Sequence, residues 1–392
     1  MTEDTDGRAG PADRRVPLGT VAREWTRIGL TGFGGPPAHI ALLRALMVDQ
    51  KGWMDAREFQ DANAACGLLP GPASTQLSIF CAYRVAGPAG AIVGGIGFIV
   101  PAVIVILVLS VLFLASNPPL WVRGAGAGAG AAVAAVAVQA ARGLIGPSFD
   151  HVRGSRARTA RWIAYVAIGV AAAALIGAYL VLALLACGLA EVLIRHRPSE
   201  VRSFGLLMPA SVSTGGIGAL AWTAFKVGAL SFGGGFVIIP LMQGDAVNTY
   251  HWMTNAEFLN AVALGQVTPG PVVATVAAVG YAAHGIAGGL LAALVAFTPS
   301  FSFILLGGGR FEQLRTNQRA RAFLDGAGPA AIGAILGAAI VLAGVLQEAW
   351  QFAILGGAAV ALLILKRGVV ETLVVAGALG VLLALAGAPL PH

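Results

Sequence analysis

Two stretches of this chain, each 40 residues long, carry the same pattern. Residues 33–72 read FGGPPAHIALLRALMVDQKGWMDAREFQDANAACGLLPGP, and residues 232–271 read FGGGFVIIPLMQGDAVNTYHWMTNAEFLNAVALGQVTPGP. Aligned without a gap, they are identical at 15 of 40 positions, including Phe-Gly-Gly, Trp-Met, Glu-Phe and Pro-Gly-Pro. Rare residue types and their spacing both recur, so the chain consists of two homologous halves. Such repeats are typical of transporters built from two related helical bundles.

The composition places these halves in a lipid bilayer. Of 392 residues, 57% are hydrophobic and only 11% are charged, with a mean hydropathy of +0.81. A soluble protein carries about 25% charged residues. The run from Ile92 to Leu114 has no charge and exceeds the roughly 20 residues that a helix needs to cross a membrane. A soluble enzyme, a secreted protein and a disordered protein are excluded. We predict an all-α, polytopic protein of the cytoplasmic (inner) membrane.

The basic residues indicate how the two halves are oriented. The net charge of +7 comes mainly from arginines in short gaps between apolar runs, a pattern typical of cytoplasmic loops and not of a nucleic-acid partner. Residues 115–123 hold one arginine and their counterpart 307–321 holds four, whereas residues 142–161 hold five and their counterpart 344–351 holds none. Equivalent loops are therefore expected on opposite sides, which predicts inverted-topology repeats with broken helices.

The same patterns divide the chain into four parts. We expect a polar cytoplasmic N-terminal tail at residues 1–17, a first repeat at 18–195, a linker at 196–217 and a second repeat at 218–390. Residues 162–194 are interpreted as a helical hairpin. An inverted second half needs an odd number of crossings before it. Either residues 204–232 add a crossing, or the hairpin crosses only once.

Glycine and proline interrupt the apolar runs at equivalent places in both halves. Proline lacks an amide hydrogen and paired glycines loosen a helix. Freed backbone groups are tolerated in a membrane only where they line a cavity, and there the amides that start a broken helix can face an anionic substrate. The alternative is that these motifs are plain kinks or turns. The predicted substrate-binding residues of these motifs are Gly34, Gly35, Pro36, Pro70, Gly71, Pro72, Ser74, Thr75, Gly233, Gly234, Pro269, Gly270 and Pro271.

Two pairs of charged residues occupy equivalent positions in the halves. Arg27 and Lys226 each precede a Phe-Gly-Gly motif and are predicted to help bind an anion. The alternative is a side chain that snorkels to the membrane surface. Glu58 and Glu257 each precede a Pro-Gly-Pro motif by twelve residues and are candidates for proton coupling. The alternative for them is a charge at a helix N-terminus in the interface.

No other known chemistry is indicated. The sequence contains no Walker A motif and no cluster with metal-ligand spacing, so we expect no cofactor, no metal and no enzyme. The run from Gly124 to Gly130 alternates glycine with alanine, which favours close helix packing over nucleotide binding. His39 has Ile238 as its counterpart and is only a weak candidate for carrying a proton. Neutral hydrogen bonds to substrate oxygens are expected from Gln76, Gln266 and Thr268.

The combination of Phe33-Gly34-Gly35-Pro36, Trp53-Met54 with Glu58-Phe59, and Pro70-Gly71-Pro72 closely resembles the chromate ion transporter family. All of it except the first proline recurs in the second half. The resemblance extends from about residue 18 to 387 and matches the long, two-domain form of the family. It implies inverted repeats, export of chromate from the cytoplasm with resistance to chromate, and sulfate as the structural analogue. Because Gly235 stands at the counterpart of Pro36, equal binding of substrate at both breaks is left open.

The expected partners are chromate or a sulfate-like oxyanion and the lipid bilayer, with a homodimer left open. For a dianion, the membrane potential contributes a free energy of roughly 4.6 kcal/mol per 100 mV, which favours exit from a negative cytoplasm. An exporter can therefore run uncoupled, by alternating access between the repeats. The alternatives are an importer of sulfate or a related oxyanion, and an anion channel.

Overall fold

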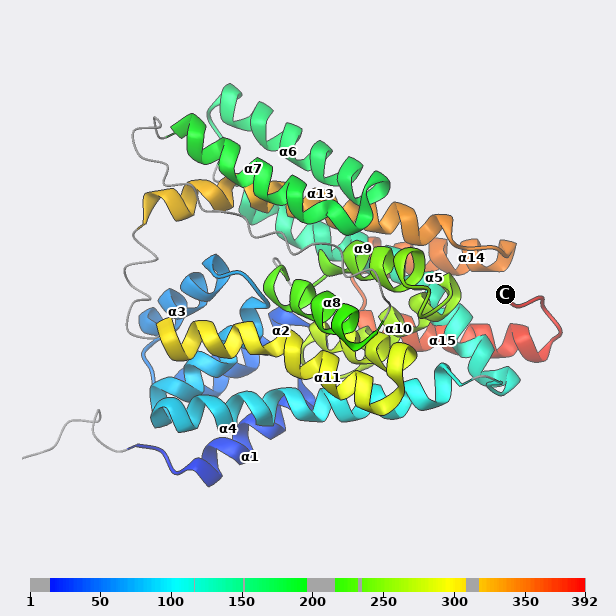
Figure 1. Ribbon diagram of the computed structural model, residues 1–392, viewed down its shortest axis with the longest axis horizontal. Helices are drawn as coiled ribbons and strands as arrows, with labels where there is room; N and C mark the ends of the chain where they lie inside the picture. Colours follow the sequence, from blue (N-terminus) through cyan, green and yellow to red (C-terminus); the bar gives the residue numbers. More distant parts are fainter. Residues whose placement is uncertain are drawn as a thin grey trace, which may run out of the picture.

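The computed structural model describes residues 15–115, 117–150, 152–195, 216–231, 235–307 and 317–391. Every regular element in these ranges is a helix, so the predicted all-α class is confirmed (Figure 1). Most of the predicted tail and linker, together with Gly233 and Gly234, lies outside the described residues.

The helices follow the same order in each half. The first half contains α1 (Leu18–Thr31), α2 (Pro36–Arg44) continued by η1 (Ala45–Gln50), α3 (Ala56–Leu68), α4 (Ala73–Phe113), α5 (Leu120–Asp150), α6 (Arg156–Leu175), η2 (Gly177–Tyr179) and α7 (Leu180–Arg195). The second half contains α8 (Ile217–Ala229), α9 (Ile238–Gln243) continued by η4 (Gly244–Thr249), α10 (Asn255–Val267), η5 (Val272–Ala274), α11 (Thr275–Gly307), α13 (Gln318–Gly344), α14 (Ala349–Ala359) continued by η6 (Val360–Ile364) and α15 (Val369–Leu385).

Four of the described helices are long and apolar enough to span a membrane. By length and apolar composition, α4, α5, α11 with η5, and α13 can each cross a bilayer. The predicted hairpin at residues 162–194 is confirmed, because it forms α6 and α7 joined by the short η2.

The helix α4 is bent back on itself. Ala86 and Gly87 leave the helical conformation, and Gly87 takes a positive φ of +67°. A methyl group built on Gly95 would lie 3.0 Å from the Ile79 side chain, although a straight helix separates residues 16 apart by about 24 Å. Residues 73–85 therefore pack antiparallel against residues 88–113.

The second half repeats this bend in α11. His284 and Gly285 are the non-helical residues, with Gly285 at φ +64°. A methyl group on Gly289 would lie 2.7 Å from the Ala277 carbonyl oxygen. Each half thus contains a short helix that starts at a Pro-Gly-Pro motif and is folded onto a long one.

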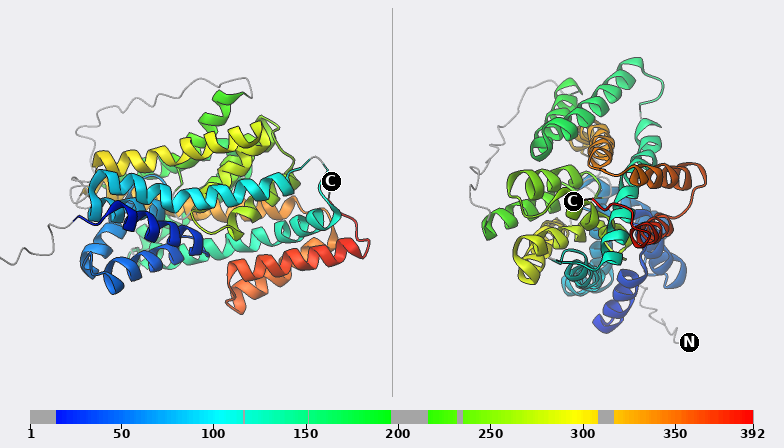
Figure 2. Two further views of the ribbon diagram at one scale, coloured as in Figure 1. Left: turned by 90° about the horizontal axis from the view of Figure 1, so that it is seen from below. Right: turned by 90° about the vertical axis from the view of Figure 1, so that its right-hand side faces the viewer.

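The two halves interlock through their long helices. The first-half helix α5 packs against α14 and α15, and the second-half helix α13 packs against α6 and α7 (Figure 2). Glycines at these crossings let the backbones touch, because Gly128 lies against Ala376 and Gly333 lies against Val166. Small residues commonly support such close approach in membranes, so the interpretation of residues 124–130 as a packing run is confirmed.

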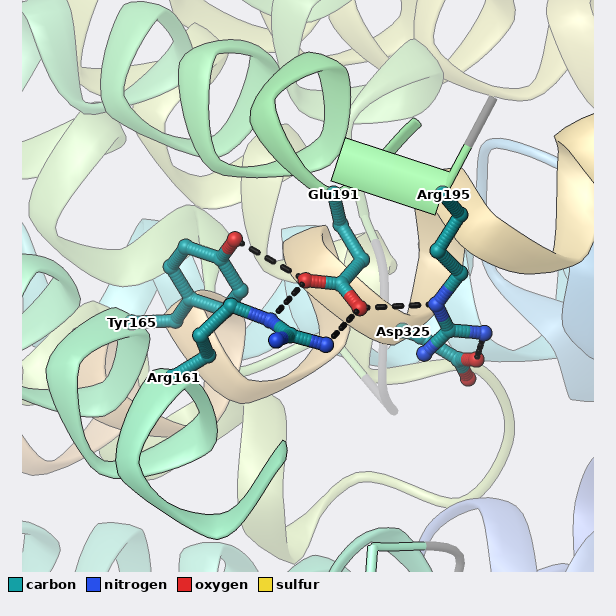
Figure 3. Close-up of polar contacts among 5 residues, drawn as sticks. All are labelled: Arg161, Tyr165, Glu191, Arg195 and Asp325. Atoms are coloured by element: carbon teal, nitrogen blue, oxygen red, sulfur yellow. Dashed lines mark hydrogen bonds and ion pairs between the residues drawn. The ribbon is translucent and has the colours of Figure 1, made fainter. Parts of the chain in front are cut away.

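An ion-pair network fastens α6, α7 and α13 to one another (Figure 3). The buried carboxylate of Glu191 accepts hydrogen bonds from Arg161 at 2.8 and 3.0 Å, from the Tyr165 hydroxyl at 3.0 Å and from Arg195 at 2.7 Å. Arg195 also donates to Asp325 of α13 at 2.6 Å. The start of α6, the end of α7 and the start of α13 therefore lie at the same end of the molecule.

We expect Glu191→Ala to lower the free energy of unfolding by about 2 kcal/mol, because several charged hydrogen bonds are lost while the partly exposed arginines regain water. Thermal unfolding of the detergent-purified protein measures this loss. The matched control is Glu371→Ala, which removes an exposed pair with Arg367 at 3.7 Å and should cost less than about 0.5 kcal/mol. Equal losses in the two variants would contradict a structural role for the network.

Candidate functional site

Both Pro-Gly-Pro motifs interrupt helices, as the sequence predicts. The first lies between the end of α3 and Ala73, the first residue of α4, and Gly71 takes φ +114°. The second lies between α10 and η5, and Gly270 takes φ +97°. Glycine adopts positive φ without the steric penalty of a side chain, so the backbone conformation requires glycine at both positions.

The first Phe-Gly-Gly motif breaks the chain as well. Gly34 and Gly35 have φ of +99° and +73°, and Pro36 opens α2 directly after them. In the second half Gly235 has φ +92°. Methyl groups on Gly35 and Gly235 would lie 3.8 and 3.3 Å from the side chain of Val272, which follows the second Pro-Gly-Pro motif. Gly35 of the first motif and Gly235, the residue after the second, therefore both lie close to the second Pro-Gly-Pro motif.

The first Pro-Gly-Pro motif sits against helices of the second half. A methyl group on Gly71 would lie 3.1 Å from the carbonyl oxygen of Gly228 in α8. It would lie 3.6 Å from the hydroxyl of Ser300 in α11. Ser300 was not singled out in the sequence, because a lone serine in an apolar helix carries no spacing signal.

The second Pro-Gly-Pro motif makes the reciprocal contact with the first half. A methyl group on Gly270 would lie 3.5 Å from the Gly29 carbonyl oxygen in α1 and 2.8 Å from the Ala102 side chain in α4. Gly29 and Ala102 are the repeat counterparts of Gly228 and Ser300. Along the long arms, Gly95 lies against Phe301 and Gly289 lies against Leu107, so the long arms of α4 and α11 run antiparallel (Figure 1).

A chain of hydrogen bonds connects the two Pro-Gly-Pro motifs through His39. The Gly270 amide donates to the Gly32 carbonyl at 3.0 Å, and His39 Nε2 lies 2.9 Å from the same oxygen. A carbonyl only accepts, so Nε2 carries the proton and Nδ1 of the neutral ring accepts from the Ser74 hydroxyl at 3.3 Å. The ring is fully buried and packs edge-on against Phe98. His39 therefore joins the second motif to the first turn of α4.

The candidate cation Lys226 is engaged in an ion pair. Its ammonium lies 2.5 Å from the carboxylate of Asp245, which also accepts a hydrogen bond from Thr223 at 2.8 Å. The side chains of Lys226 and Asp245 are 14% and 4% exposed. Asp245 was missed in the sequence because its repeat counterpart is Leu46, so the duplication gives no signal there.

The equivalent cation Arg27 is also paired, but with a carboxylate of its own helix. Arg27 lies 3.2 Å from Glu24 one turn earlier in α1, and Lys51 lies 3.8 Å from the same residue. The Arg27 side chain is 56% exposed and faces an open groove beside Thr26 and Leu30. This ion pair was predictable from the sequence, because residues three apart on a helix are neighbours.

The candidate proton-coupling residue Glu58 lies near the start of α3. Its amide donates to the capping side chain of Asp55 at 2.8 Å, and its carboxylate pairs with Arg84 at 2.6 Å. Glu257 occupies the same position in α10, where it forms a capping box with Thr254. These contacts favour the interpretation of both glutamates as helix N-terminal charges.

Glu257 also lines a cavity at the end of the molecule opposite to the Glu191 network. The cavity has a volume of about 330 Å³ and is bordered by Arg123, Asn260, Gln347 and Gln351. It lies beside the end of α4, and its lining combines these polar side chains with apolar residues such as Phe113.

Comparison with known proteins identifies what the chain is similar to. The model of the family described as chromate transporter matches residues 19–192 and 218–384. The chain is 31% identical over 378 residues to the chromate transport protein of Cupriavidus metallidurans, covering 93% of this chain and 92% of that protein. It is 31% identical over 347 residues to the chromate transport protein of Pseudomonas aeruginosa, covering 82% and 80%. No solved structure gives a significant match.

Proposed function

We propose the substrate and the direction of transport from one premise: the chain belongs to the chromate transporter family. It is therefore a multi-pass membrane transporter of an oxyanion and not an enzyme. Our proposal is that it is a secondary transporter that carries chromate, a tetrahedral oxyanion like sulfate, out of the cytoplasm. Export of this kind confers chromate resistance.

The observation that carries the proposal is the position of the two Pro-Gly-Pro motifs. Each motif starts a short helix and lies against the opposite half of the chain. The first amides of a helix have no intrahelical acceptor, and the helix dipole places partial positive charge there. Two helix N-termini that begin inside the bundle, the first carrying the unpaired hydroxyl of Thr75, suit an anion.

The proposed mechanism is alternating access between inverted-topology repeats. Antiparallel α4 and α11, and the reciprocal contacts of Gly71 and Gly270, support an axis that relates the halves within the membrane plane. Rocking of one half against the other exposes the central motifs to each side in turn. The predicted residues of both Phe-Gly-Gly and both Pro-Gly-Pro motifs form the substrate path.

The orientation is proposed from the charged end of the molecule. Arg161 and Arg195 lie there in the Glu191 network, and Arg142 lies in the last part of α5, which leads into the start of α6. Basic residues gather on the cytoplasmic side of membrane proteins. This end is therefore assigned to the cytoplasm.

The paired cations and the capping glutamates take secondary roles in this mechanism. Arg27 remains bound to Glu24 and Lys226 to Asp245, so both cations act as structural ion pairs and not as ligands of the substrate. A dianion leaves a negative cytoplasm without coupling, so export needs no protonation of Glu58 or Glu257. Proton coupling through these glutamates would be needed only for the alternative function, in which the protein imports the oxyanion against the membrane potential.

Flux in proteoliposomes tests the proposed function. We expect chromate and sulfate to compete, phosphate to compete less, and efflux from the cytoplasmic face to rise with a potential that is negative on that face. Uptake toward the cytoplasmic face driven by a proton gradient would favour the importer. Large unitary currents without counterflow would favour the channel, and the absence of any oxyanion flux would reject all three.

A further inference from the structure

We propose that the oxyanion binds at the first Pro-Gly-Pro motif alone, between the start of α4 and the hydroxyl of Ser300 from the second half. The second motif is its structural counterpart and not a second binding site. This inference rests on the proposed function and adds the identity of the site and of its donors.

The residues that follow the two motifs differ in chemistry. After Pro72 the chain continues with Ala73, Ser74, Thr75 and Gln76, whereas after Pro271 it continues with Val272, Val273, Ala274 and Thr275. The hydroxyl of Thr275 is already used, because it donates to the Val272 carbonyl at 2.7 Å. The first turn after the second motif therefore offers no free side-chain donor, while the first turn of α4 does.

Two hydroxyls at the first motif are buried and have no partner. The Thr75 side chain lies in the first turn of α4, and Ser300 lies against Gly71 across the boundary between the halves. Both residues are 0% exposed, and neither hydroxyl makes a hydrogen bond. Buried polar groups are nearly always paired, so two unpaired donors beside one helix N-terminus indicate a place for a ligand.

The neighbours of Ser300 show that its free hydroxyl is not a general property of this helix. Serine and threonine in helices commonly bond back to a carbonyl four residues earlier. Thr298 does so with Leu294 at 2.7 Å, and Ser302 does so with Thr298 at 2.9 Å. Ser300 lies between them and makes no such bond, so its hydroxyl is available to a ligand.

The donors around the first motif match a tetrahedral oxyanion. The Thr75 and Gln76 amides bond to the Pro72 carbonyl at 3.0 Å each, which leaves the preceding amides of Ala73 and Ser74 at the open start of the helix. Gln76 Nε2 donates to the Pro70 carbonyl at 2.7 Å and so holds the loop in place. Amides and hydroxyls then surround the substrate from both halves.

All of these donors are neutral, which suits a transporter. The two candidate cations are held by Asp245 and Glu24, so no lysine or arginine has to leave a dianion for release to occur. A site that spans both halves is also disrupted when the halves rock apart. Binding and release are thus coupled to the conformational change.

The test compares Ser300→Ala with Ser302→Ala in the full-length protein reconstituted in proteoliposomes. We expect Ser300→Ala to raise the KM for sulfate and chromate about tenfold, the effect of one hydrogen bond to a charged ligand. Ser302→Ala removes a hydroxyl that is already bonded within the same helix, so its KM should stay within about twofold. Sulfate should also raise the Tm of the detergent-purified wild type and of Ser302→Ala, and much less that of Ser300→Ala.

The possible outcomes separate this inference from the proposed function. If the wild type moves no oxyanion, the proposed function is wrong. If the wild type transports and Ser300→Ala keeps the wild-type KM and Tm shift, the site is wrong while the function stands. Should Ser300→Ala fail to fold, Thr75→Val carries the same expectation. An equal rise in KM for Thr275→Val, which removes the hydroxyl in the first turn after the second motif, would indicate two symmetric sites and overturn the proposal.

Discussion

Replacing Gly71 by alanine should reduce oxyanion transport to background. Gly71 has φ +114°, a conformation that costs an L-residue roughly 1–2 kcal/mol. The new methyl group would also lie 2.7 Å from Gln76 Nε2 and 3.1 Å from the Gly228 carbonyl oxygen, and overpacking of this kind costs about 1–3 kcal/mol. The start of α4 must then move away from α8 and α11, which separates the donors that face the substrate.

The matched control for this variant lies one turn earlier, in α3. Gly67 has no heavy atom within 4 Å of the position that a methyl group would occupy, and alanine favours a helix by up to about 1 kcal/mol over glycine. Gly67→Ala should therefore transport like the wild type. Tracer flux and Tm are measured for both variants. Wild-type flux in Gly71→Ala would show that the close crossing of the halves at this motif is not needed for transport.

Replacing Asp245 by leucine should destabilise the protein strongly. The change leaves the ammonium of Lys226, which is 14% exposed, without its carboxylate. Breaking a buried ion pair from one side costs about 3–5 kcal/mol. Leucine is already accommodated at Leu46, the counterpart in the first half, where it is fully buried. Size and shape at such a position are therefore no obstacle, and the expected fall in Tm comes from the unpaired charge.

The double variant Asp245→Leu with Lys226→Met separates a structural role from a transport role. Replacing both members of a buried pair by apolar residues of similar volume is often neutral or stabilising, so Tm should return to near the wild-type value. Because the proposed site contains only neutral donors, sulfate flux should return as well. A double variant that folds like the wild type and does not transport would place Lys226 in the substrate path and contradict a neutral site.

The sequence predicted the fold class and the breaks because these depend on local properties. Apolar runs without charge have to be helices in a bilayer, since every backbone group must be satisfied within the segment. Pro-Gly-Pro cannot continue a helix, and Gly71 and Gly270 take the positive φ that only glycine adopts readily. The duplication marked the breaks as significant because it preserved them in register.

The partners of the polar residues were not predictable in the same way. Asp245 pairs with Lys226, but its counterpart in the first half is Leu46, which has no carboxylate. The first half neutralises Arg27 with Glu24 instead. The duplication therefore pointed to Lys226 and Arg27 and was silent about the groups that neutralise them. The counterpart of His39 is Ile238, so the duplication gives no signal for His39. In the structure His39 links Ser74 to the Gly32 carbonyl, which also accepts from the Gly270 amide of the second half.

The sequence by itself determined that this is a two-repeat, all-helical membrane protein with broken helices, and it located the breaks at Pro-Gly-Pro. The bends at Gly87 and Gly285 appeared only in the structure. Only the tertiary structure decided that each Pro-Gly-Pro motif lies against the opposite half, and that Ser300 lies beside Gly71 although 229 positions separate them in the chain. The physical reason is that breaks and spans follow from backbone chemistry within a few residues. Hydrogen-bond and charge partners follow from which helices pack together, and packing joins residues that the sequence keeps far apart.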